Sequence, residues 1–171
     1  MATVLTQTSS ANTAITFDPS SLATSSTFVA GRESTQIDNT SNKYVDALVT
    51  VYGITGHAST APTVGQYIGL WLWGSDVSLA TTAIDVLDGT DSAETLGHVS
   101  VLNSLKLVAA PAVTVATAAL KYYIMPFSVA SFFGGRMPQF WGLYLAHNHT
   151  GALAASQASL FNYVGITYTS T

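Results

Sequence analysis

The sequence predicts an all-β fold, a single β-sandwich with jelly-roll-like connections. Short runs of β-branched and aromatic residues recur along the chain, and glycine, proline and Asp-Gly turns separate them. No long amphipathic helix competes with these runs. The chain has 171 residues, which is most simply one domain that buries its own core. Periodicity favours a sandwich but does not separate a jelly roll from other sandwiches.

We divide the chain into an extended N-terminal arm, residues 1–27, and a sandwich domain, residues 28–171. The arm is rich in Ser, Thr and Ala and has few large apolar side chains, among them Ile15, Phe17 and Leu22. Alone, such a segment buries too little surface to offset the entropy of ordering it. A flexible tail is one interpretation. We favour an arm that lies on another chain and uses its sparse apolar residues as anchors.

Two segments show the clearest strand patterns. In residues 43–52 every second side chain is apolar and would face the core. Residues 66–73 are apolar on both faces, which is typical of a central strand covered on both sides. Further strands are expected within 99–108, 119–125, 140–147 and 160–168. The side chains expected to share one core are Val45, Val49, Ile68, Leu72, Leu143 and Leu145.

One or two short helical turns should interrupt the strands. Pro126 can precede or open a helix, residues 128–133 can continue it, and Gly134 and Gly135 can end it. A second short helix is expected over residues 93–97, with Asp91 or Ser92 as its N-cap.

The charge content is the most informative feature of the composition. Only 8% of the residues are charged, against roughly 25% in an ordinary domain. The exterior must therefore consist largely of hydroxyl, amide and apolar groups, which suits a surface that stays in contact with other protein. The net charge is −4, and the five basic residues are scattered, so we expect no nucleic-acid partner.

Composition also limits the chemistry and argues against a membrane span. The chain has no cysteine, which excludes disulfides and thiolate chemistry. The most apolar window, residues 105–125, is interrupted by Lys106, Pro111 and Lys121, so we expect no membrane span.

Two clusters could hold a cation. His147 and His149 would share a face of a strand and could bind a metal, with His57 or His98 as a third ligand if the fold brings one close. Residues 85–94 carry Asp85, Asp88, Asp91 and Glu94, whose oxygens could bind Ca²⁺. We favour structural roles for both clusters, a polar strand end and a turn with a helix cap. No metal and no cofactor is expected.

Aromatic side chains could instead form a sugar-binding platform. Because most of them lie inside the strand runs, core packing is the favoured role. No nucleophile elbow, phosphate-binding loop or close carboxylate pair is recognisable, so we expect no catalytic residues and no enzyme. The aromatic residues considered are Tyr67, Trp71, Trp73, Tyr122, Tyr123, Phe132, Phe133, Phe140 and Trp141.

Several short motifs resemble a group of small tailed-bacteriophage virion structural proteins, over roughly residues 28–168. They are AGREST (30–35), IDNT (37–40), YVDALV (44–49), PTVG (62–65), WLW (71–73), DGTD (88–91), FFGGRMP (132–138) and WGLY (141–144).

The resemblance implies a non-enzymatic virion protein, made in the cytoplasm of the bacterial host. We expect a decoration or cement protein on the capsid exterior, present in multiple copies or as a homo-oligomer. Its partners would be the major capsid protein or other virion proteins. A tail or portal-region adaptor, and a carbohydrate-binding adhesin or fibre module, remain alternatives.

Overall fold

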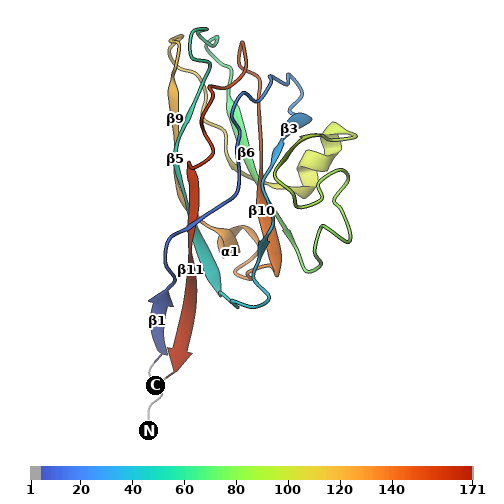
Figure 1. Ribbon diagram of the computed structural model, residues 1–171, viewed down its shortest axis with the longest axis vertical. Coiled ribbons are helices and arrows are strands. Elements are labelled where there is room, and N and C mark those ends of the chain that lie inside the picture. The colour runs from blue at the N-terminus through green and yellow to red at the C-terminus, as the bar shows by residue number, and fades with distance from the viewer. Residues whose placement is uncertain (1–4, 171) are drawn as a thin grey trace.

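Two antiparallel sheets packed face to face form the molecule, as the sequence predicts (Figure 1). The computed structural model describes residues 5–170. The first sheet has the order β1-β11-β5-β9, and β2 also pairs with β11. Its strands are β1 (Leu5–Ser9), β2 (Thr13–Ala14), β5 (Asp46–Thr55), β9 (Lys121–Ser128) and β11 (Phe161–Ser170).

The second sheet has the order β7-β3-β10-β6-β8, and β4 also pairs with β10. Its strands are β3 (Ala30–Glu33), β4 (Ile37–Asp38), β6 (Ile68–Ser75), β7 (Ser92–Thr95), β8 (Lys106–Ala109) and β10 (Phe140–His147). Without the short β2, β4 and β7, two four-stranded sheets remain, β1-β11-β5-β9 and β3-β10-β6-β8. The chain crosses from one sheet to the other at every step except between β6 and β8, which are neighbours in the second sheet. This is the connectivity of a jelly roll.

The main core fills the space between the sheets. Val49, Ile68, Leu72, Leu143 and Leu145 are all buried in this one cluster, which confirms five of the six predicted core positions. The sixth prediction, Val45, is wrong, because this side chain is 44% exposed.

Val45 occupies one of the alternate positions that face inward within the strand, but it lies just before the first residue of β5. There it lines a shallow surface pocket with Gln7, Ile166 and Tyr168. The alternation predicts the correct face within the strand, but it does not say where the strand begins.

A second apolar cluster covers the other face of the second sheet. Trp71, Trp73 and Tyr144 from β6 and β10 pack there against Leu79, Leu87, Leu96 and Leu105 from the long connection between β6 and β8. This connection explains why residues 68–73 are all buried, as the apolar run predicts. The second sheet is thus covered on both sides by the chain itself.

The prediction that the first 27 residues are ordered by another chain is wrong for much of this segment. Ile15, Phe17 and Leu22 are buried in the main core, and Ile15 donates its backbone N–H to the carbonyl of Phe161. The apolar residues are anchors, but the surface that they bind belongs to the same chain. Residues 1–4 lie outside the described residues.

The helix predictions are partly correct. Helix α1 (Val129–Phe132) begins at an N-cap, Ser128, and Gly134 and Gly135 follow it with positive φ angles, as predicted. Residues 93–97 do not form a helix, because Ala93 and Glu94 pair with β3 as part of β7. The second helix is instead the 3-10 helix η1 (Val99–Ser104), so the strand predicted over 99–108 is reduced to β8. No helix of the described residues is long and apolar enough to cross a membrane.

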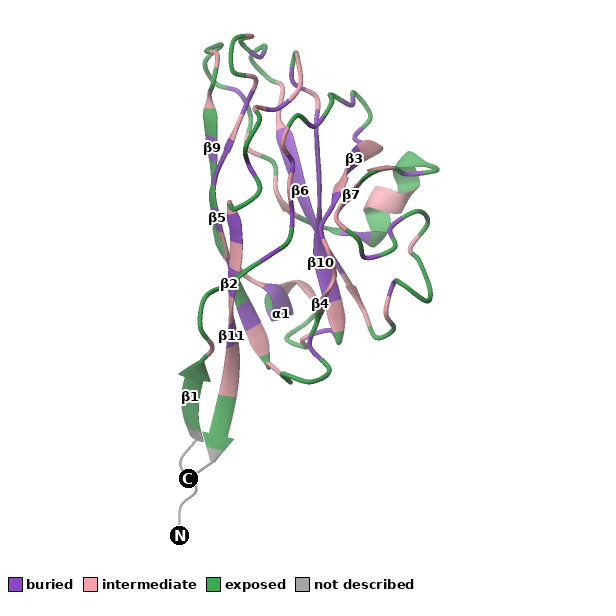
Figure 2. Ribbon diagram, in the orientation of Figure 1, coloured by how far each residue is buried: buried purple, intermediate pink, exposed green. Residues whose placement is uncertain are grey.

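Strands β1 and β11 continue beyond the sandwich as a two-stranded ribbon (Figure 1). Five consecutive residue pairs join them, from Leu5 opposite Ser170 to Ser9 opposite Ile166. Residues 6–9 of β1 are exposed, and Figure 2 shows the lower half of the ribbon as exposed on both strands.

Candidate interaction surface

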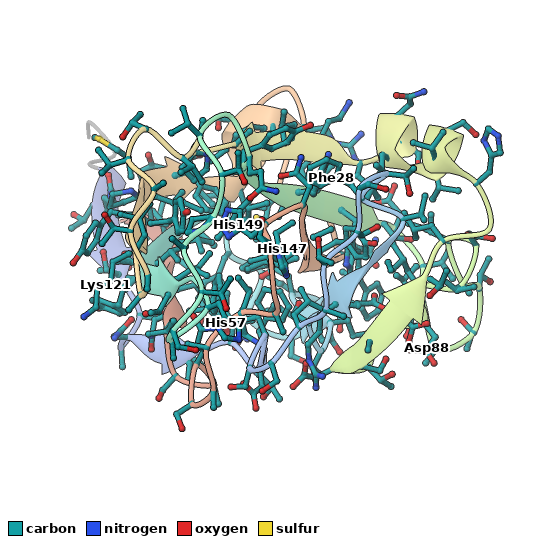
Figure 3. The ribbon with its side chains drawn as sticks, turned by 90° about the horizontal axis from the view of Figure 1, so that it is seen from above. Phe28, His57, Asp88, Lys121, His147 and His149 are labelled. Atoms are coloured by element: carbon teal, nitrogen blue, oxygen red, sulfur yellow. The ribbon has the colours of Figure 1, made fainter. Side chains whose placement is uncertain are left out.

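The predicted histidine pair is a structural feature of the interior rather than a metal site. His147 and His149 lie side by side (Figure 3) and both are buried. The Nε2 atom of His147 lies 2.9 Å from the carbonyl oxygen of Leu22, and its Nδ1 accepts the backbone N–H of His149 at 3.2 Å. These contacts require the neutral ring with its proton on Nε2, so His147 has no free lone pair for a metal.

His149 has a different environment. Its ring lies 4.9 Å from the ring of Tyr122, and among the described residues neither ring nitrogen has a hydrogen-bond partner. Burial, and then the neighbouring His147, lower the pKa of His149 to about 4. The other two histidines serve local turns: His57 accepts the backbone N–H of Thr60, and His98 caps η1. The structure therefore does not bring a third histidine to the predicted pair.

The predicted acidic loop is only partly a cluster. Asp85 accepts the backbone N–H of Gly97, and Asp91 forms an ion pair with Arg32 at 2.6 Å. Asp88 and Glu94 instead meet Glu33, and the three carboxylates place oxygens within 4.8 Å of one another. Asp91 pairs with Arg32 instead of capping a helix. Of the four predicted acids, only Asp88 and Glu94 belong to one carboxylate cluster.

Glu33 is the residue of this cluster that sequence reasoning missed. It is fully buried and accepts the backbone N–H groups of Asp88 and Gly89. Burial raises the pKa of Glu33 to about 8, so the carboxyl carries a proton at neutral pH. These three residues could hold a cation, but the protonated Glu33 also allows the group to exist without one. The only local signal was an acidic residue at an inward position of a strand.

Most of the predicted aromatic set is core, as expected. Trp71, Trp73, Trp141 and Tyr122 are buried. Four more are partly buried and pack against the two core clusters: Tyr67, Phe132, Phe133 and Phe140. The exception is Tyr123, which is 70% exposed and whose ring covers Gly53. This residue belongs to a surface that the sequence analysis did not single out.

The outward side of the first sheet is an apolar surface, which we call the outer face. Its largest exposed side chains are Leu48, Tyr52, Tyr123 and Met125, with exposures from 42% to 83%. Val164, which is half-buried, lies directly opposite Leu48 on the neighbouring strand. A fully exposed aromatic side chain offers about 200 Å², so Tyr52 and Tyr123 alone expose roughly 250 Å². Leu48 and Met125 add to this area, and the largest apolar patch of a monomer, about 300–600 Å², is often functional.

A groove continues the outer face at the open side of the sandwich. It lies between the edge strands β8 and β9 and shares Tyr123 and Met125 with the outer face. The groove is lined by Val108, Ala109, Ala110, Pro111, Tyr123, Ile124, Met125, Pro126 and Phe127. These side chains are all uncharged.

Charge is nearly absent from the first sheet. Of the nine acidic and five basic residues, only Asp46 and Lys121 belong to its strands. The carboxylate of Asp46 accepts hydrogen bonds from Ser128 Oγ at 2.7 Å and from the Ala130 backbone N–H at 2.9 Å. Lys121 is thus the free charge of these strands, and Figure 3 shows it at the opposite end of the molecule from Asp88.

Comparison with protein-family models, with curated proteins and with solved structures found no match for the chain.

Proposed function

We propose that this chain is a non-enzymatic structural protein of a bacteriophage virion, a decoration or cement subunit on the capsid exterior. The observation that carries the proposal is the uncovered outer face of the first sheet, on which Lys121 is the free charge. The second sheet has a comparable apolar side, but the connection between β6 and β8 covers it. No described segment covers Leu48, Tyr52, Tyr123 or Met125 in the same way, so a surface of another protein is the natural cover.

A neutral surface suits attachment to a protein lattice. Docking of charged groups requires their desolvation, which can cost more than the new ion pairs return. The outer face has Lys121 as its free charge, and a lysine stem can bend so that its amine stays in water. Many copies on one shell also turn individually weak contacts into stable retention. The likeness of the sequence motifs to small virion proteins supports the same role.

The proposal is tested on the phage that encodes the chain. Met125→Lys places a charge on the most exposed apolar residue of the outer face, and Val99→Lys is the matched control on η1, where a valine is 48% exposed. We expect wild-type and Val99→Lys particles to carry equal copy numbers, and Met125→Lys particles to lose most copies. Quantitative mass spectrometry of purified virions measures this, and electron cryo-microscopy locates the protein.

Absence of the wild-type chain from purified virions would refute the proposal. Equal loss from both variants would show that the outer face has no special part in attachment. Salt is a second measurement, because screening weakens only charge contacts. We expect attached copies to survive a rise to about 1 M salt. Release by salt alone would contradict attachment through a neutral surface.

A further inference from the structure

We infer that the ribbon of β1 and β11 is a self-association element, and that β1 pairs antiparallel with β1 of a second copy across a twofold axis. The pairing would join the first sheets of two copies into one continuous sheet. This inference does not depend on the proposed virion role, because it concerns only copies of this chain.

The ribbon lacks the support that isolated strands need. β1 is the edge of its sheet, and β11 pairs with β5 only as far as Ile166. Beyond this point only two strands remain, and residues 6–9 are exposed (Figure 2). Two-stranded ribbons are marginally stable in water, and a third strand or a packed face is normally required.

The edge of β1 also lacks the protection that the other sheet edges have. Natural edge strands avoid pairing with other chains through charged residues, proline or bulges. β9 has Lys121, Pro126 and two register shifts, β8 has Lys106, and β7 has Glu94. β1 has the sequence LTQTS and a regular ladder of five pairs. Apart from the two-residue β2, whose shortness limits pairing, β1 is thus the described edge strand without a charge, a proline or a bulge.

The sequence of β1 fits an identical strand. Thr6, Gln7 and Thr8 read the same in both directions, so a twofold axis through Gln7 places each threonine opposite a threonine of the second copy. Cross-strand threonine pairs stabilise sheets, and the ribbon already contains one, with the hydroxyls of Thr8 and Thr167 2.8 Å apart. The paired edges are uncharged, so the net charge of −4 causes no repulsion at the contact.

The absence of cysteine makes a direct test simple. Gln7→Cys in the full-length chain should form a disulfide-linked dimer under mild oxidation, because the two residues would lie opposite each other near the axis. Lys106→Cys on the edge of β8 is the matched control and should cross-link at least tenfold more slowly. Equal rates for the two variants would overturn the inference.

Mass in solution gives an independent measurement. Sedimentation of the wild-type protein should show a concentration-dependent dimer. Gln7→Lys should raise the dissociation constant of this dimer at least tenfold and leave the melting curve of the monomer unchanged. A wild-type protein that stays monomeric up to millimolar concentration would overturn the inference. A trimer, or a dimer that Gln7→Lys does not affect, would overturn the twofold pairing through β1.

Discussion

Acidification should destabilise the fold through His149. This side chain is 1% exposed, and burial, together with His147, lowers its pKa from 6.5 to about 4. The unfolded chain therefore binds a proton below about pH 6.5, whereas the folded chain does not until about pH 4. The contribution of His149 to stability is constant above pH 6.5 and is lost as the pH falls through this interval of about 2.5 units. At 1.36 kcal/mol per unit, the free energy of unfolding should fall by roughly 3 kcal/mol.

The assay is urea unfolding of the wild type and of His149→Phe at pH 7, 5.5 and 4. Phenylalanine keeps an aromatic ring against Tyr122 but has no nitrogen to protonate. Burial also lowers the pKa of His147, but this residue and all the carboxylates are present in both proteins. Their contributions therefore largely cancel in the difference between the two curves. The free energy of unfolding of the variant, relative to that of the wild type, should rise by about 3 kcal/mol between pH 7 and pH 4. Identical pH profiles would refute the reasoning.

Three further predictions concern the core and the acidic cluster. Leu72→Ala should cost about 2–5 kcal/mol in urea unfolding, whereas Val45→Ala should cost about 0.5 kcal/mol or less; equal losses would contradict the core assignment. Because burial raises the pKa of Glu33 from 4.5 to about 8, its contribution to stability is present below pH 4.5 and is lost as the pH rises towards 8. Glu33→Gln should abolish this loss, and an unchanged profile would contradict it. A chelator should leave the melting temperature unchanged at neutral pH, and a clear decrease would show that a cation occupies the cluster of Glu33, Asp88 and Glu94.

The sequence predicts the parts of the fold whose own residues determine their structure. β6 is apolar on both faces, and this pattern is typical of a strand covered on both sides. Helix α1 has its own stop signals, the two glycines after it. β7 has no such pattern: Ser-Ala-Glu-Thr becomes a strand because β3 offers an edge to it. Long-range pairing of this kind leaves no local mark in a single sequence.

The candidate surfaces have the same limit. The sequence predicts Ile15 and Phe17 as anchors, but a sparse apolar pattern does not tell whether its partner surface belongs to the same chain. Glu33 and Asp88 are 55 residues apart, so their meeting could not be predicted from spacing. The outer face could not be predicted from the sequence for a different reason. The alternation in residues 43–52 places Tyr52 on the outward side, but only the fold shows that nothing in the described chain covers it.

The few charged residues are distributed unevenly between the two sheets. The acidic residues Glu33, Asp88, Asp91 and Glu94 gather around β3 and β7 at one edge of the second sheet. The first sheet has Asp46, which is bound to the start of α1, and Lys121. A chain that had merely lost charges would be equally neutral on both sheets. The outer face and the ribbon instead belong to the same nearly neutral sheet, so both proposed contacts should involve few charges and be insensitive to salt. The acidic edge of the other sheet keeps the molecule hydrated.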